Sequence, residues 1–157
     1  MINLFKSFKY AASGFIFCAR YERNMRIHIA VTLYVLYFSR FYEFSRAEII
    51  LLILTCVSVL TLEMLNTSIE MIVDKVSPKY NTLAKIAKDA AAGAVLTAAS
   101  AAAVIGVLLF WDTEVFSEIF QYFAENIIRI IILIITAVLA FLFVLSGKRR
   151  KKRGVKK

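Results

Sequence analysis

The chain has 157 residues, of which 61% are hydrophobic, with a mean hydropathy of +0.73 and a net charge of +9. A soluble domain averages roughly 45–50% apolar residues, so the composition predicts a small all-α integral membrane protein and excludes a soluble catalytic module. The single histidine, His28, excludes a multi-histidine metal site. Cys18 and Cys56 lack CxxC spacing and are predicted to be small buried hydrophobic residues.

The predicted elements begin with a surface helix. Residues 3–21 carry apolar side chains at three- and four-residue spacing with lysines between them, which predicts an amphipathic helix on the membrane surface. Four apolar stretches follow, each near the roughly 20 residues that cross a bilayer. They are 27–44, 47–73, 86–111 and 127–146. The first of these stretches is the weakest candidate for a membrane span, because its apolar core is short and ends at Arg40. The third is rich in alanine, whose small side chain permits close helix packing in lipid.

Lysine and arginine gather in three segments, which are the residues before 27, the connection 74–88 and the tail 148–157. The connection at 112–125 is acidic instead. By the positive-inside rule both termini and the 74–88 connection are predicted to be cytoplasmic, and an even number of crossings agrees with this. The basic tail is expected to attract anionic lipid headgroups, which we favour over nucleic-acid binding for a short tail beside a span.

Polar side chains interrupt the second predicted span. Glu63 and Glu70 are seven residues apart, so they differ by only about 20° around a helix. Asn66 and Asp74 fall on the same stripe. A charge at the membrane centre costs roughly 2.5–3.5 kcal/mol on insertion scales, so such residues are kept mainly where they have a function. This face of the helix is the predicted functional site.

Lys88 and Asp89 begin the third predicted span, at the level of Glu70 and Asp74. Carboxylates beside a lysine at a membrane surface suit an ion pathway, a structural salt bridge or a phosphate site. The chain has no GxxxxGK[ST], GxGxxG or zinc motif, so no standard nucleotide fold is present. A bound nucleotide would therefore depend on Mg²⁺, which takes few carboxylates and completes its octahedron with phosphate oxygens.

Two motifs carry a family resemblance: Glu63-x-x-Asn66-Thr67-Ser68-Ile69-Glu70-x-x-Val73-Asp74 and Ala87-Lys88-Asp89-x-Ala91-Ala92-Gly93. They resemble the prokaryotic diacylglycerol kinase and undecaprenol kinase family, as do Phe8-Lys9-Tyr10-Ala11-x-x-Gly14 and Glu22. The resemblance covers about residues 3–112. It implies a homotrimeric membrane kinase of the bacterial cytoplasmic membrane, with a surface helix and three spans per subunit. Such a kinase transfers the γ-phosphoryl group of MgATP to a membrane lipid alcohol.

The resemblance also implies roles for individual residues. Glu63 matches the general base that acts on the lipid hydroxyl, and Ala92 lies at the lipid substrate. Glu22 and Glu70 match the ligands of a divalent metal, while Asn66 and Asp74 match supporting polar positions. The implied ATP contacts are Tyr10, Glu22, Glu70, Lys79, Tyr80, Asn81, Lys88 and Asp89.

The chain departs from this family pattern after the third span. We divide it into a kinase core (1–112), an acidic loop with an extra transmembrane helix (113–147) and a basic cytoplasmic tail (148–157). The purine-side loop carries Asn81 where some relatives have histidine, which leaves the nucleotide preference open. Undecaprenol is the favoured acceptor, by analogy with Gram-positive undecaprenol kinases, and diacylglycerol is the alternative. A cation or proton conduit without enzymatic activity is a distant third hypothesis.

Overall fold

The computed structural model describes residues 4–147, and its elements in that range are helices. In chain order they are α1 (Leu4–Tyr21), α2 (Arg23–Phe38), the 3₁₀ turn η1 (Ser39–Phe41), α3 (Arg46–Val76), α4 (Thr82–Phe110), α5 (Thr113–Ala124) and α6 (Ile127–Leu145). The predicted all-α class is confirmed. The basic tail 148–157 lies outside the described residues, so its attraction to anionic lipid stays a prediction.

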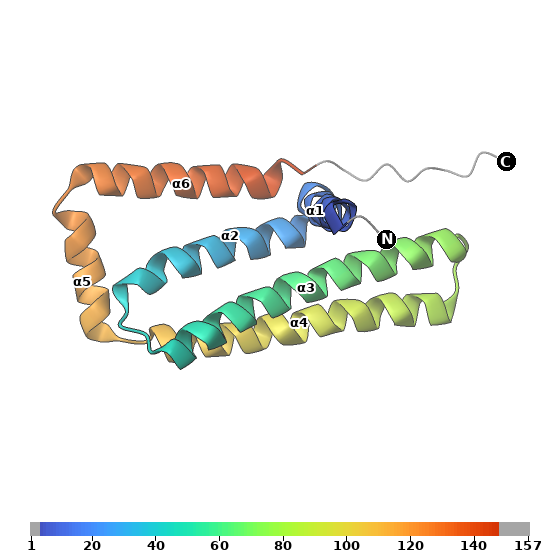
Figure 1. The fold of residues 1–157 in the computed structure, drawn as a ribbon, viewed down its shortest axis with the longest axis horizontal. Helices are drawn as coiled ribbons and strands as arrows, with labels where there is room; N and C mark the ends of the chain where they lie inside the picture. Colours follow the sequence, from blue (N-terminus) through green and yellow to red (C-terminus); the bar gives the residue numbers. More distant parts are fainter. Residues whose placement is uncertain (1–3, 148–157) are drawn as a thin grey trace.

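Helices α2, α3, α4 and α6 run side by side, while α5 lies across one end of the bundle and α1 lies crosswise where α2 begins (Figure 1). The most extensive contact joins α3 to α4; α2 packs against α3, and α6 packs against α2. Helix α1, the turn between α3 and α4, and the end of α6 lie towards the side of the bundle opposite α5, and the α3–α4 hairpin extends beyond the other two (Figure 1). The location of these segments on one side of a membrane stays a prediction.

Three of the described helices, α3, α4 and α6, are long and apolar enough to cross a membrane. Helix α2 has 16 residues, about 24 Å at 1.5 Å per residue, which is short of a hydrocarbon core of about 30 Å. The predicted span 27–44 therefore stays a prediction. The chain changes direction between η1 and α3, where the hydroxyl group of Tyr42 donates to the carbonyl oxygen of Phe110 at 2.9 Å.

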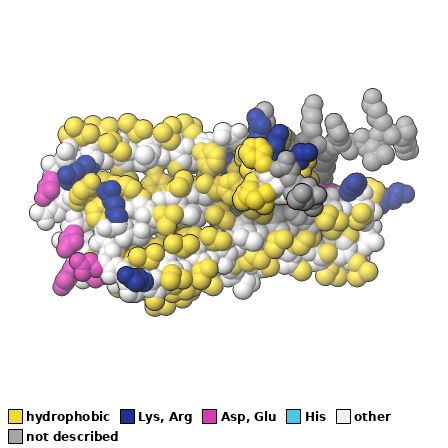
Figure 2. All heavy atoms as spheres, in the orientation of Figure 1, with side chains coloured by type: hydrophobic (Ala, Val, Ile, Leu, Met, Phe, Trp, Pro, Cys, Tyr) yellow, Lys and Arg dark blue, Asp and Glu magenta, His cyan; other side chains and the backbone are white. Residues whose placement is uncertain are grey.

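Hydrophobic side chains cover the middle of the visible face, and charged side chains lie towards its two ends (Figure 2). Apolar residues of the spans remain largely exposed, for example Leu54, Leu96 and Leu108. A surface that is apolar along its length and charged at its ends suits a bilayer rather than water.

The acidic connection after α4 contains a helix that we did not predict. Asp112 is the N-cap of α5: its Oδ1 accepts hydrogen bonds from the backbone N–H groups of Glu114 and Val115 at 2.9 and 3.3 Å. Phe116 and Phe120 recur at helical spacing within it. This helical spacing of apolar residues could have predicted α5, but the acidic residues between them make it hard to recognise in the sequence.

Local capping fixes where the long helices begin. Ser45 and Glu48 form a reciprocal capping box at the start of α3. The Oδ1 atom of Asn81 accepts a hydrogen bond from the backbone N–H of Ala84 at 3.1 Å and caps α4. Each cap satisfies an N–H group that the first helical turn would otherwise leave unpaired.

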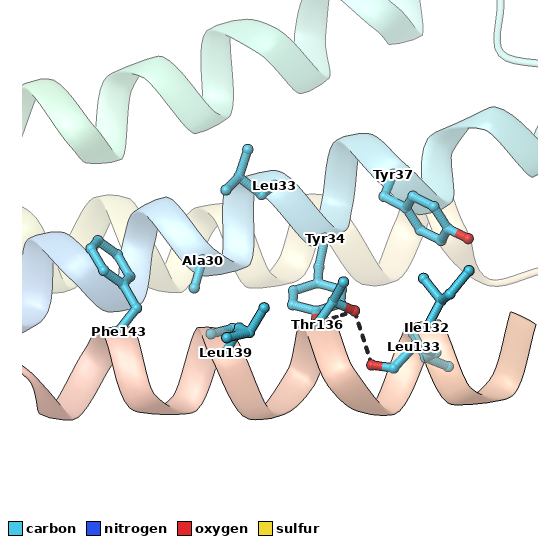
Figure 3. A pocket seen from close by; sticks show the side chains of 10 residues that line it. Ala30, Leu33, Tyr34, Tyr37, Ile132, Leu133, Thr136, Leu139 and Phe143 are labelled. Atoms are coloured by element: carbon cyan, nitrogen blue, oxygen red, sulfur yellow. Dashed lines mark hydrogen bonds between the residues drawn. The ribbon is translucent and has the colours of Figure 1, made fainter.

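Helix α6 lies along the face of α2 that is turned away from α3. A cavity of about 410 Å³ separates parts of the two helices, and the hydroxyl group of Tyr34 donates to Thr136 Oγ1 across it at 3.2 Å (Figure 3). Its other lining residues are Ala30, Leu33, Tyr37, Ile132, Leu133, Leu139, Ala140 and Phe143. Because no carboxylate lines it, this cavity is distinct from the polar stripe of α3.

Candidate active site

The polar stripe of α3 is most deeply buried at Glu63. The side chains of Glu63, Asn66 and Thr67 are buried, with Glu63 only 2% exposed. The hydroxyl group of Thr67 donates to the carbonyl oxygen of Glu63 at 3.0 Å. Glu70 is half-buried and Asp74 is exposed. The stripe therefore leads from the interior of the bundle to the end where α3 turns into α4.

Glu63 and Asn66 face a cavity of about 240 Å³ between α2, α3 and α4. Glu63 Oε2 and Asn66 Oδ1 are buried there and have no hydrogen-bond partner among the described residues. A buried oxygen without a donor costs about 1–3 kcal/mol. A ligand hydroxyl group would supply the missing donor. The cavity is completed by Asn24, Ile27, His28, Ala92, Val95, Leu96 and Ala99.

Two further carboxylates, those of Glu22 and Glu70, lie within electrostatic range of Glu63 but do not line this cavity. Glu22 is the single residue between α1 and α2. Like charges in one place oppose each other's ionisation, and a bound cation would relieve this repulsion. Within the described part of the chain, no three His, Cys, Asp or Glu residues form a metal-binding group. A pair of carboxylates fits Mg²⁺, which fills its remaining positions with water and phosphate oxygens.

An ion pair joins α3 to α4 near the same end of the bundle. Lys88 Nζ lies 2.8 Å from Asp74 Oδ1, and the two side chains are 34% and 53% exposed. An exposed pair of this kind contributes at most about 1 kcal/mol to stability, so its main effect is to place the ammonium group. Asp89 is the next residue and is exposed. The structure thus brings Lys88 and Asp89 to the same end of the bundle as Glu70.

The remaining predicted nucleotide contacts lie on α1 and in the α3–α4 turn. Tyr10 is on α1, Tyr80 is in the α3–α4 turn, and their side chains are 71% and 82% exposed. Lys79 is exposed in the same turn. Asn81 caps α4 through its side chain, which is a structural role that the resemblance does not imply. Contact of these residues with a nucleotide stays a prediction.

Two cavity residues of α2 were missed by the sequence analysis. Asn24 and His28 both line the cavity that holds Glu63. They are four residues apart and therefore share one helix face, which was the available signal. Nothing in the sequence alone places that face opposite α3.

A second cavity of about 240 Å³ shares His28 and Ala99 with the first and continues along the same three helices. It reaches Leu52 on α3 and Gly106 on α4. From Asn66 to Leu52 the two cavities follow α3 for about 21 Å. Most of the second lining is aliphatic: Val31, Val35, Leu52, Val59, Ala99, Ala102, Ala103 and Ile105. The combined groove is polar at Glu63 and mostly aliphatic beyond it, with Thr32, Thr55 and Cys56 also in its lining, a layout that suits an amphiphilic alcohol.

Comparison with known proteins identifies the family. A family model described as prokaryotic diacylglycerol kinase matches residues 9–110. Undecaprenol kinase of Bacillus subtilis is 43% identical over 108 residues, which cover 69% of this chain and 88% of that protein. Diacylglycerol kinase of Synechocystis sp. is 43% identical over 105 residues, which cover 66% of this chain and 60% of that protein.

A more distant relative, diacylglycerol kinase of Pseudomonas aeruginosa, is 34% identical over 80 residues, covering 51% of this chain and 65% of that protein. No solved structure matches the chain. The match to the family model ends at Phe110, so it includes the carboxylates, Lys88 and the groove but neither α5 nor α6. The chain belongs to the prokaryotic diacylglycerol kinase family and is a lipid kinase.

Proposed function

We propose that the chain transfers the γ-phosphoryl group of ATP to the hydroxyl group of undecaprenol. The observation that carries this proposal is Glu63, a buried carboxylate with an unpartnered oxygen at the polar head of an apolar groove. A lipid alcohol whose tail lies along the groove would bring its hydroxyl group to Glu63, on the side from which Glu22 and Glu70 approach.

Glu63 acts as the general base. It accepts the proton as the O–H bond of the lipid breaks and the new O–P bond forms, while the bond between the γ-phosphorus and ADP breaks and ADP leaves. General bases contribute about 10²–10⁴-fold to rate. Asn66, one helical turn away in the same cavity, holds the hydroxyl group in line with the base.

The phosphate groups belong at the end of the bundle that carries Lys88, Asp89 and the α3–α4 turn. Phosphoryl transfer has a loose transition state, so positioning and charge neutralisation supply most of the rate. Glu22 and Glu70 would hold Mg²⁺, which when bound neutralises the phosphate oxygens. Lys88, placed by its ion pair with Asp74, adds a further positive charge.

The groove favours one long chain over two. Beyond Glu63 its lining is mostly aliphatic, and the hydroxyl group of Thr55 donates to the carbonyl oxygen of Leu51 on its own helix at 2.7 Å. A polyprenol has one hydrocarbon tail and no polar group beyond its hydroxyl, whereas a diacylglycerol adds a second chain and two ester groups. The Bacillus relative, matched over 88% of its length, carries the name undecaprenol kinase.

We also propose that the site faces the cytoplasm of a bacterium, with both termini on that side; the use of ATP and the basic segments support this orientation. We further propose that the kinase is a homotrimer, as the family resemblance implies. The exposed apolar faces of α3 and α4 and the small residues of α4 would allow close packing between subunits.

The test is a paired assay of purified protein with MgATP and either undecaprenol or diacylglycerol in mixed micelles, following γ-phosphate in the lipid fraction. We expect kcat/KM for undecaprenol to exceed that for diacylglycerol at least tenfold. Equal or faster transfer to diacylglycerol would reject undecaprenol as the acceptor. No transfer to either lipid would reject the assignment of these two acceptors.

A further inference from the structure

Arg26 is buried to 5% exposure one turn after Glu22, and its guanidinium group joins three helices. One terminal nitrogen donates to the carbonyl oxygens of Ala19 and Arg20, in the last turn of α1, at 3.4 and 3.2 Å. Nε donates to the carbonyl oxygen of Val144, in the last turn of α6, at 3.2 Å. Burying an arginine is costly, and the negative ends of two helix dipoles offset that cost.

The end of α6 has room for Arg26 only because residue 147 is glycine. A Cβ atom built on Gly147 would overlap the guanidinium group of Arg26. The backbone does not call for glycine there, since no glycine among the described residues has a positive φ angle. The guanidinium group is the far end of a flexible side chain, so a side chain at position 147 would displace it without disrupting a helix.

Arg26 also fixes the junction that carries Glu22. Glu22 lies between α1 and α2 and occupies the N-cap position of α2. Its backbone N–H donates to the carbonyl oxygen of Cys18 at 2.9 Å. Arg26 holds the next two carbonyl groups of the same turn, those of Ala19 and Arg20. Arg26 thus ties the last turn of α1 to the first turn of α2, on either side of Glu22.

We infer that Arg26 is a positioning residue for Glu22, and that the end of α6 holds Arg26 in place through Val144 and Gly147. The segment after the family core is thus part of the active assembly and not only a membrane anchor. The inference rests on the proposed function in one respect, the binding of Mg²⁺ by Glu22.

The test uses full-length Gly147→Val, with Ser146→Val as the matched control one residue away. Gly147→Val should raise the Mg²⁺ concentration for half-maximal kinase activity about three- to tenfold while leaving the lipid KM unchanged, and Ser146→Val should change neither. Arg26→Lys, which keeps the charge but loses the planar fork of donors, should give a similar shift. The double variant Arg26→Lys/Gly147→Val should show less than the product of the two shifts, because both act through one contact.

Hydrogen exchange is measured on the same variants without lipid or ATP. It tests the contact between α6 and Arg26 independently of the proposed kinase function. Gly147→Val should speed exchange of the backbone amides at 20–26 at least threefold over wild type. Unchanged exchange would overturn the contact between α6 and Arg26. The positioning role would be overturned by a different pair of results. In that case Gly147→Val would exchange faster without a change in its Mg²⁺ requirement, while Glu22→Gln would shift that requirement. An unchanged requirement in Glu22→Gln would instead reject Glu22 as the metal ligand, and the functional half of the inference with it.

Discussion

Replacing Glu63 by glutamine should separate catalysis from stability. Glutamine keeps the size of the side chain but cannot accept the proton of a lipid hydroxyl group. A general base is worth about 10²–10⁴-fold, so kcat should fall by that factor, or about 3–5 kcal/mol at 1.36 kcal/mol per tenfold change. The KM for ATP should stay within about twofold, because Glu63 lies in the lipid cavity between Asn66 and Ala92.

The same replacement should stabilise the protein. Glu63 is 2% exposed, has one oxygen without a partner and interacts with two other carboxylates. Glutamine removes the charge, and its amide group brings donors into a cavity that contains the unpartnered Asn66 Oδ1. Relief of one unsatisfied buried group is worth about 1–3 kcal/mol. One kcal/mol corresponds to roughly 2–4 °C for a chain of this size, so the midpoint of thermal unfolding should rise by several degrees.

The assay pairs lipid phosphorylation at saturating undecaprenol with thermal unfolding of the same detergent-solubilised sample. Glu118→Gln, at an exposed position on α5, is the control and should change neither quantity. A variant at Glu63 that keeps more than a tenth of the wild-type kcat would refute the base assignment. A lower unfolding midpoint would refute the argument from burial.

Four further predictions address other parts of the molecule. Glu22→Gln and Glu70→Gln should each raise the Mg²⁺ concentration for half-maximal activity, since each removes one charged oxygen ligand; a Mg²⁺ titration with an unchanged midpoint would count against that residue. Lys88→Gln should raise the KM for ATP several-fold with little change in the KM for lipid, and the reverse pattern in steady-state kinetics would contradict a phosphate contact. Ala103→Leu should fill the apolar groove and lower kcat/KM for undecaprenol about tenfold while a short prenol is still phosphorylated, whereas equal losses with both acceptors would argue against a tail in this groove. Ser45→Ala should remove the capping box of α3 and cost about 1 kcal/mol, measured as a lower unfolding midpoint at unchanged kcat.

Periodicity accounts for the parts of the fold that the sequence predicts well. The stripe from Glu63 to Asp74 follows from helical geometry alone, and α3 and α4 are long enough that an error of a few residues at each end does not change their identity. The contact between Tyr42 and the carbonyl oxygen of Phe110 could not be predicted, because its two residues are 68 positions apart in the sequence.

The site shows the same limit. The likeness to a family suggested Glu22 as a metal ligand, and the structure places it near Glu63 within one chain. The groove and the burial of Arg26 were not predictable, because each is formed by residues from three helices. In the sequence Arg26 is one of several basic residues ahead of the first apolar stretch, and only the packing of α1 and α6 distinguishes it from the exposed Arg23.

The depth at which the polar groups stop argues against a conduit for cations or protons. Beyond Glu63 the hydroxyl groups of Thr55 and Ser58 donate to carbonyl oxygens of their own helix at 2.7 Å. A conduit would need polar groups across the remaining half of the membrane, where an unpaired charge costs several kcal/mol. The groove there is lined mostly by aliphatic residues. A site that is charged at one membrane face and apolar from mid-depth onward instead suits an enzyme that takes its nucleotide from water and its acceptor from the bilayer.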